Sequence, residues 1–193
     1  MPTTGVELVT ERLRLRALRP GDAASVAALV NDWEVVRYTT SIPYPYDLHM
    51  ARAFIAAQAE RWAAWKPGGT LAEEIAFAIE RKADHALIGC IGLQPAEIQG
   101  LEFGYWIGKA YWNRGFASEA VAALTRFAFA TLGVAEIWAA AVPVNDASHR
   151  VLEKNGFAVA GAGTRESEMR GHSLPVITRK LTRSQWLATQ GHP

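Results

Sequence analysis

Alternating apolar and charged residues near the start of the chain predict the first strand. In residues 12–16, Arg-Leu-Arg-Leu-Arg, every second side chain is apolar, which is the period-two pattern of a half-buried strand. Residues 20–22, Pro-Gly-Asp, then break this pattern, and Gly21 or Asp22 is placed to cap a helix. Small apolar residues follow at helical spacing, and we expect this helix to end near Asn31.

Prolines and a capping residue organise the next part of the chain. The prolines within residues 41–46 exclude a helix there, because each proline disfavours helical geometry in the residue before it. Asp47 is a candidate N-cap for a longer helix that runs to about Lys66 and ends at a Pro-Gly-Gly turn. Residues 75–80 and 87–93 are mainly apolar and predict two strands joined as a hairpin.

The second half of the chain alternates between strand and helix patterns. We expect a strand at 102–107, a helix at 118–132 with one apolar stripe, and an apolar strand at 136–142 that is covered on both faces. A short helix should begin at Asn145 and end at the Asn-Gly pair 155–156. Two further strands are expected at 157–164 and 174–181, followed by a tail, 182–193, that can form a helix.

This order of elements predicts an α/β (α+β) fold. It comprises a mixed, twisted central sheet of about six to seven strands with helices on both faces. The β-α-β-α-β order between residues 102 and 157 requires a partly parallel sheet with right-handed crossovers. No repeat or linker interrupts the sequence, and its length suits one domain, which we place at residues 8–181.

Composition narrows the classes of function. The chain has 193 residues, with 20 Lys and Arg against 19 Asp and Glu, and a formal net charge of +1. A near-neutral charge that is not segregated along the chain removes the main electrostatic argument for a nucleic-acid partner. The longest apolar run, 137–144, has 8 residues, whereas a membrane-spanning helix needs about 20, so we expect no membrane segment.

The cysteine and histidine content points to a metal-free protein from a reducing, cytoplasmic setting. A lone cysteine, Cys90, excludes a disulfide framework and a multi-cysteine zinc site. The five histidines lack the paired spacing of a metal-binding motif. Cys90 lies in a predicted strand, and we interpret it as a small buried residue rather than a nucleophile.

The segment 108–120, Gly-Lys-Ala-Tyr-Trp-Asn-Arg-Gly-Phe-Ala-Ser-Glu-Ala, joins a predicted strand to the strongest predicted helix. Gly115 can adopt a positive φ, and neither Gly115 nor Ala117 adds bulk where a ligand would approach the backbone. The free N–H groups at the start of the helix then converge on one point, together with the positive end of the helix dipole. Such a loop is an anion site or, alternatively, a tight turn that only packs helix on sheet.

Several motifs in a fixed order resemble the GNAT N-acetyltransferases. Residues 104–108, Gly-Tyr-Trp-Ile-Gly, followed by 112–120, are similar to the acetyl-CoA-binding core of that family. Residues 145–148 and 151–157 are similar to its second block. Residues 8–16 resemble the start of the RimJ/RimL-type branch, which acetylates the N-termini of ribosomal proteins. The resemblance covers residues 8–181 and implies the fold predicted above.

The resemblance implies a site for acetyl-CoA as co-substrate. In this family the pyrophosphate lies on the backbone of the glycine-containing loop, and the pantetheine arm lies between two parallel strands that splay apart, here 102–107 and 136–142. An amide-bearing arm can satisfy the N–H and C=O groups that splaying leaves unpaired. The implied cofactor-binding residues are Trp106, Ile107, Gly108, Arg114, Gly115, Phe116, Ala117, Ser118 and Asn145.

Two positions of this implied site need comment. Asn145 matches the family asparagine that holds the pantetheine end, but an asparagine there is also a good helix N-cap. The usual motif has Gln or Arg three residues before Gly115, whereas this chain has Trp112, which cannot donate a charged hydrogen bond. The resemblance therefore supports phosphate binding by backbone N–H groups, with Arg114 as an alternative cation.

The implied reaction is direct attack of a neutral amine on the thioester carbonyl, with no covalent enzyme intermediate. It needs a base for the ammonium and an acid for the leaving thiolate. Glu102, at the head of the splayed strand, is the candidate base, acting through a water; alternatively it is an ordinary strand carboxylate. Ser148 matches the family serine and is the candidate acid, a role that a water could also fill.

The sequence leaves the acceptor open. Four aromatic residues in the region that walls the acceptor channel in this family are candidate substrate contacts or, alternatively, packing residues: Trp33, Tyr38, Tyr44 and Tyr46. We expect a primary amine as acceptor, such as the α-amine of a protein N-terminus, and the alternative acceptor is a small metabolite or antibiotic amine. A non-catalytic acyl-CoA-binding module is the alternative from another class. Both a monomer and a homodimer are compatible with the sequence.

Overall fold

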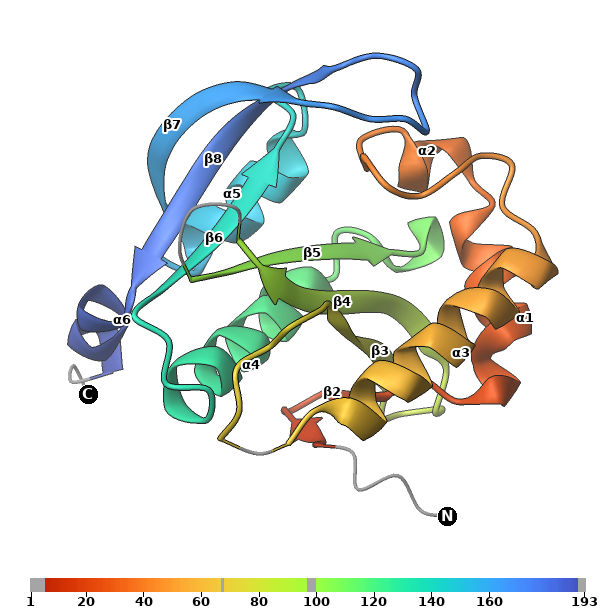
Figure 1. Ribbon diagram of the computed structural model, residues 1–193, viewed down its shortest axis with the longest axis horizontal. Helices are drawn as coiled ribbons and strands as arrows, with labels where there is room; N and C mark the ends of the chain where they lie inside the picture. The colour runs from red at the N-terminus through yellow and green to blue at the C-terminus, as the bar shows by residue number, and fades with distance from the viewer. Residues whose placement is uncertain (1–5, 67, 97–99, 191–193) are drawn as a thin grey trace.

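The computed structural model describes residues 6–66, 68–96 and 100–190 (Figure 1). Within these residues, eight strands form one sheet in the order β1-β2-β3-β4-β5-β6-β8-β7. The strands are β1 (Leu8–Val9), β2 (Leu13–Ala17), β3 (Ile75–Arg81), β4 (Leu87–Pro95), β5 (Leu101–Ile107), β6 (Glu136–Ala141), β7 (Ala158–Arg165) and β8 (Leu174–Thr182). The α-helices are α1 (Ala23–Val30), α2 (Trp33–Val36), α3 (Leu48–Ala64), α4 (Phe116–Ala130), α5 (Asp146–Lys154) and α6 (Arg183–Gln190).

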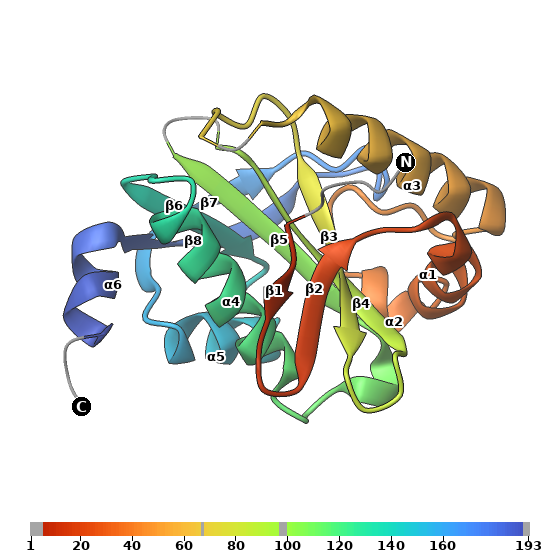
Figure 2. The same cartoon turned by 90° about the horizontal axis from the view of Figure 1, so that it is seen from below.

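Two helical layers cover the sheet, as predicted. Helices α4 and α5 lie on one side of β5, and α3 lies on the other (Figure 2). Each side has its own core: one contains Phe77 and Leu124, and the other contains Cys90 and Trp106 together with residues of α1 and α3. Because successive residues of a strand point to opposite faces, Tyr105 faces α4 and α5 whereas Trp106 faces α1 and α3.

Strands β5 and β6 are parallel but separate after a short contact. They pair at two positions only, Leu101 and Glu102 of β5, whereas β5 remains paired with β4 along its whole length. The predicted splay is therefore confirmed. Successive residues of a strand direct their backbone N–H and C=O groups to opposite neighbouring strands. Because the N–H of Gly108 donates to Ile88 O beside β4, the even-numbered residues of β5 direct these groups to β4 and the odd-numbered residues direct them to the gap. The residues whose backbone groups face the gap are Phe103, Tyr105 and Ile107.

Helix α4 begins beside the gap and is clamped to the start of the chain. Gly115 precedes it with a φ of +78°, a conformation that costs other residues about 1–2 kcal/mol. Glu119 in its first turn accepts hydrogen bonds from Thr10 Oγ1 at 2.5 Å, Arg12 N at 2.8 Å and Arg12 Nε at 2.7 Å. Arg12 Nη1 also donates to Arg114 O at 2.9 Å. We call these bonds the β1–β2 clamp.

The elements differ from the predictions in three places. Strand β1 was not expected, and neither was the four-residue helix α2, whose N-cap Asp32 accepts a hydrogen bond from Glu34 N at 2.9 Å. The prediction that β6 is covered on both faces is wrong, because only alternate residues such as Ile137 and Ala139 are buried. Asp47 caps α3 as predicted, accepting a bond from Met50 N at 2.8 Å.

Candidate active site

A cavity of about 1120 Å³ reaches both faces of the sheet at the gap between β5 and β6. Its lining includes Tyr105 and Ser148 on the side of α4 and α5, and Gly92, Glu102 and Trp106 on the opposite side. A ligand that enters between α4 and α5 can therefore meet a second ligand that enters beside α3. This is the geometry that a two-substrate reaction requires.

The start of α4 forms the end of the binding site that is suited to an anion. The residues 115–118 line the cavity, and the first N–H groups of a helix have no carbonyl partner further back in the chain. Arg150 and Lys154 of α5 line the same cavity and outnumber Asp146 there. These groups fit a pyrophosphate, because free N–H groups at a helix start and positively charged side chains line the same cavity. A Cβ at Gly115 would lie 3.3 Å from Arg12 Nη2, so the loop has little room for a larger residue.

The edge of β5 offers fewer free groups than the sequence suggested. Trp106 is paired with Cys90 of β4, so it lines the cavity with its side chain rather than with edge backbone groups. Gly108 cannot supply an edge N–H either, because that N–H is bonded to Ile88 O. A Cβ at Gly108 would lie only 2.6 Å from Leu29 Cδ2, which gives the glycine a packing role.

Trp112 has a specific role in the loop before α4. Its indole Nε1 donates to Ile107 O at 2.6 Å, so one carbonyl at the gap is already bonded within the protein. The side chain thus ties the loop to the end of β5 and lines the cavity. Arg114 is exposed and is not among the cavity-lining residues; its carbonyl, rather than its side chain, is held in the β1–β2 clamp.

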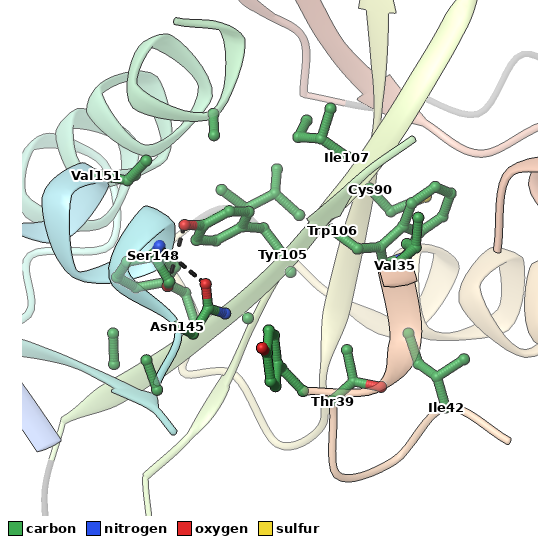
Figure 3. Close-up of a pocket in the computed structure, with 18 of the residues that line it drawn as sticks. Val35, Thr39, Ile42, Cys90, Tyr105, Trp106, Ile107, Asn145, Ser148 and Val151 are labelled. Carbon is green, nitrogen blue, oxygen red and sulfur yellow. Dashed lines mark hydrogen bonds between the residues drawn. The ribbon is translucent and has the colours of Figure 1, made fainter. Parts of the chain in front are cut away.

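Three polar residues meet on the cofactor side of β5 (Figure 3). The Asn145 side chain caps α5 by accepting a bond from Ser148 N at 3.2 Å. The Tyr105 hydroxyl donates to Ser148 Oγ at 3.1 Å. Burial raises the pKa of Tyr105 above its usual value, although the bond to Ser148 works in the opposite direction, so the phenol remains a donor. Sequence reasoning did not select Tyr105, although strand alternation placed it on the face opposite Trp106.

Glu102 is buried and belongs to an ion pair. Its Oε2 accepts a hydrogen bond from Arg165 Nη2 at 2.5 Å, so the start of β5 is tied to the end of β7. It also lines the cavity, on the side that faces α3. The carboxylate is therefore neither an exposed strand residue nor free of partners.

The structure divides the four aromatic candidates into two pairs. Tyr38 and Tyr46 line the cavity, and burial raises the pKa of Tyr46 to about 12. Trp33 and Tyr44 are outside the lining, so their prediction as substrate contacts is not supported. They are 45% and 48% exposed, and their rings pack against each other at a centroid distance of 5.5 Å.

A bridge of hydrogen bonds joins the turn between β7 and β8 to a loop that lines the cavity. The turn between β7 and β8, residues 166–173, lies against the loop between α2 and α3, residues 37–47 (Figure 1). Arg170 Nη2 donates to Val36 O at 2.6 Å and to Ile42 O at 2.8 Å, and Ser167 Oγ donates to Thr40 O at 2.7 Å. These bonds are called the bridge below.

Two residues beside this site have packing roles: Trp33, which lies outside the cavity lining, and Cys90, which borders the cavity. The Arg170 guanidinium lies 5.3 Å from the Trp33 ring centroid, so Trp33 supports the bridge from outside. Burial raises the pKa of the Cys90 thiol, as expected for a small buried residue. Within residues 6–66, 68–96 and 100–190, no group of three or more His, Cys, Asp or Glu side chains could hold a metal ion. No helix in the same residues is long and apolar enough to cross a membrane.

A splayed parallel pair, a glycine-led helix start at the gap and a cavity open to both faces are the features of an acyl-CoA-dependent transferase. Residues 12–158 match the family described as acetyltransferase (GNAT) domain, and the chain belongs to this family. It is an acetyl-CoA-dependent acetyltransferase, as the motifs predicted.

Relatives and solved structures agree with this assignment. The uncharacterized N-acetyltransferase YoaA of Bacillus subtilis is 31% identical over 159 residues, which cover 80% of this chain and 84% of the relative. The structure of Mycobacterium smegmatis RimJ in complex with CoA-disulfide superposes with a TM-score of 0.73 at 18% identity, covering 92% of this chain and 89% of that chain. The structure of spermidine N-acetyltransferase of Vibrio cholerae, in complex with CoA and spermine, superposes with a TM-score of 0.74 at 22% identity, covering 92% of this chain and 99% of that chain. The two superpositions show a common fold.

Proposed function

We propose that the protein acetylates the primary amine of a small molecule, with acetyl-CoA as the acetyl donor. The observation that carries the choice of acceptor is the bridge, through which Arg170 and Ser167 fix the loop of residues 37–43 that lines the cavity. A protein N-terminus needs an open groove that admits an extended chain, whereas a small amine suits a closed pocket. Solved neighbours include a RimJ and a spermidine acetyltransferase, so the fold alone does not choose between these acceptors.

In this proposal the cofactor side of the cavity binds CoA mainly through backbone groups. The N–H groups at the start of α4, from Gly115 to Ser118, bind the pyrophosphate, and Arg150 and Lys154 add positive charge. Edge groups of Phe103 and Tyr105 and the N–H of Ile107 are available to the amides of the pantetheine arm, whereas the Ile107 carbonyl is bonded to Trp112. Acetyl-CoA supplies an activated acetyl thioester at this site.

The polar residues beside the gap have acid and base roles in the same proposal. The neutral acceptor amine attacks the thioester carbonyl, and the C–S bond then breaks. Ser148 donates its proton to the leaving thiolate and regains one from the attacking nitrogen, so the serine hydroxyl is restored. Glu102 accepts the ammonium proton through a water at Oε1, because Arg165 bonds only Oε2. Asn145 combines two roles: its Oδ1 caps α5, and its amide nitrogen is available to the pantetheine end.

A thiol-release assay tests the proposal. Acetyl-CoA is incubated with the protein and either small primary amines or peptides with free N-termini, and CoA release is recorded with product mass. We expect small amines to be acetylated with a higher kcat/KM than any peptide. Faster turnover of peptides would reject the small acceptor and favour a protein N-terminus. Calorimetric binding of CoA without turnover of any amine would instead indicate a binding module.

A further inference from the structure

A row of small residues crosses the sheet on the side that faces α3. Ala76 of β3 is paired with Gly92 of β4, and Gly92 is paired with Gly104 of β5. Directly paired residues share a face, so no side chain larger than a methyl group rises from this row. Gly92 and Gly104 line the cavity, and a Cβ at Gly104 would meet nothing within 4 Å. The row is therefore a trough in the cavity floor that leads from β3 to the gap beside β5.

Glu74, the residue before β3, places its carboxylate in this trough. Its Oε1 lies 3.0 Å from the position that a Cβ of Gly92 would occupy. Neighbouring strands are about 4.8 Å apart, so Gly92 is one strand spacing from Gly104 and the edge of the gap. Glu74 also lines the cavity, on the wall formed with α3. The carboxylate can lie there because residue 92 is a glycine, whose missing Cβ would otherwise be only 3.0 Å from Glu74 Oε1.

The charges on this side of the cavity are unequally neutralised. Arg165 holds Glu102 at 2.5 Å, and Arg37 holds Glu34 at 3.1 Å. Arg61 holds the exposed Glu73 at 2.8 Å and reaches Glu74 Oε2 at only 3.4 Å.

Glu74 is accordingly the least neutralised of these carboxylates. Gln58 Nε2 also bonds Oε2, at 3.4 Å, and Oε1 has no hydrogen-bond donor within the described part of the chain. Burial raises the pKa of Glu74, Arg61 acts against this, and no further cation on α3 or β4 faces it. A cationic ligand group would supply the missing partner.

We propose that Glu74 Oε1 binds a cationic group at the non-reacting end of the acceptor, so that the preferred acceptor is a short aliphatic diamine. The reacting amine then lies at the gap beside Gly104, and the second ammonium lies over Gly92, one to two strand spacings away, roughly 5–10 Å. This inference rests on the proposed function, because it places a small amine in the same cavity. An acceptor with a terminal carboxylate is disfavoured, since the nearby Arg61 is already held by Glu73.

Three probes of equal length test the charge at the far end. They are 1,4-diaminobutane, butylamine and 4-aminobutanoate, which end in a cation, a methyl group and an anion. For the unmodified protein we expect kcat/KM to be about tenfold or more higher for diaminobutane than for butylamine, since hydrogen bonds to charged groups contribute about that factor. The difference should appear mainly in KM, because the bond holds in the ground state and the transition state alike.

Two neighbouring variants make the comparison specific. Glu74→Gln should abolish the preference for the diamine, so that the ratio of kcat/KM for diaminobutane to that for butylamine falls to about one. Glu73→Gln is the matched control, because Glu73 bonds the same Arg61 but is exposed and lies outside the cavity lining. It should keep the preference for the diamine. Circular dichroism and the melting temperature of both variants establish that the fold is retained.

The outcomes separate this inference from the proposed function. Equal turnover of butylamine and diaminobutane, a preference for 4-aminobutanoate, or an unchanged preference in Glu74→Gln would overturn the inference and leave small-amine acetylation intact. If no amine is acetylated, calorimetry of diaminobutane with the protein–CoA complex decides. Binding that Glu74→Gln abolishes supports the Glu74 site without the reaction, and absence of binding rejects it.

Discussion

The Tyr105 hydroxyl donates a hydrogen bond to Ser148 Oγ on the cofactor side of the gap, with an oxygen–oxygen distance of 3.1 Å. Because this bond occupies an acceptor position of the serine, the proton of Ser148 remains free to point into the cavity. Asn145 holds the same residue through its backbone N–H, at the positive end of α5. The arrangement presents Ser148 as a hydroxyl donor whose orientation depends on Tyr105.

Removal of the Ser148 hydroxyl should slow the acetyl transfer without releasing CoA. We expect Ser148→Ala to lower kcat by about 10²-fold, the lower range for a positioned proton donor, while the Kd for CoA changes by less than about twofold. Tyr105→Phe should lower kcat by a smaller factor, because the serine loses only its orientation. Steady-state thiol release and CoA calorimetry measure the two quantities.

The double variant tests whether Tyr105 acts through Ser148. If it does, Tyr105→Phe has no further effect on kcat in a Ser148→Ala background, since effects of residues that act as a unit are not additive. Independent, multiplicative losses would mean that Tyr105 has a separate role. An unchanged kcat in Ser148→Ala would remove the serine from the mechanism.

The glycine before α4 should control the affinity for CoA. In Gly115→Ala the alanine must adopt a φ near +78°, at a cost of about 1–2 kcal/mol, and its Cβ would lie 3.3 Å from Arg12 Nη2. If the loop relaxes to avoid this, the N–H groups of α4 no longer converge, and the Kd for CoA rises by about five- to thirtyfold. Calorimetry with CoA measures this change.

A glycine on the outer strand is the matched control for that variant. Gly163 in β7 has no positive φ, and a Cβ there would meet nothing within 4 Å. Gly163→Ala should leave the Kd for CoA unchanged. An equally unchanged Kd in Gly115→Ala would argue against α4 as the pyrophosphate site.

Loss of the bridge should open the acceptor side of the cavity. Arg170→Ala removes the bonds to Val36 O and Ile42 O, which should increase hydrogen exchange in residues 37–43 and 166–173. Peptide amines should then gain turnover relative to small amines. Met169→Ala changes an exposed residue of the same turn and serves as the control. Faster exchange without any gain for peptides would show that the bridge does not select the acceptor.

The pattern of apolar and polar residues predicted most of the fold, because most of the fold consists of helices and strands long enough to show a regular repeat. The apolar stripe of α4 and the alternation in β5 identified both elements to within two residues. Strand β1 was missed because two residues show no period, and it depends on the distant Glu119 of the β1–β2 clamp. Helix α2 was missed because four residues are too short for a helical repeat.

The candidate site was predicted where motifs are local and missed where partners are distant. Gly115 lies in a recognisable loop motif. In contrast, no residue near Glu102 in the sequence predicts its ion pair with Arg165, which is distant along the chain. Glu74 is a single acidic residue before a strand, and nothing in the sequence marks it as a binding residue. It became a candidate only because the strand pairing places Gly92 beside its carboxylate. Trp33 was placed in the channel because composition does not tell which way an irregular segment faces.

A buried ion network should dominate the stability of the N-terminal half. Arg16 Nε donates to Glu80 at 2.6 Å, and its Nη atoms donate to Asp22 at 2.8 and 3.0 Å. Arg16→Met leaves two buried carboxylates without their cation and should lower the free energy of unfolding at pH 7 by about 3–5 kcal/mol. Arg14→Met is the control, since Arg14 is 36% exposed and lies 3.7 Å from Glu80; its cost should stay below about 1 kcal/mol.

The cost of Arg16→Met should also depend on pH. Burial by itself raises the pKa of Glu80, but the hydrogen bonds from Arg16 and His85 outweigh it and lower that pKa overall. A carboxyl group with a lowered pKa in the folded protein stabilises it above the unfolded value of about 4.3, and this stabilisation is lost as the pH falls through the folded value. Denaturant unfolding from pH 7 to pH 3 should therefore show the difference between wild type and Arg16→Met shrinking below about pH 4. A constant difference over that range would mean that Arg16 stabilises the fold by packing rather than by charge.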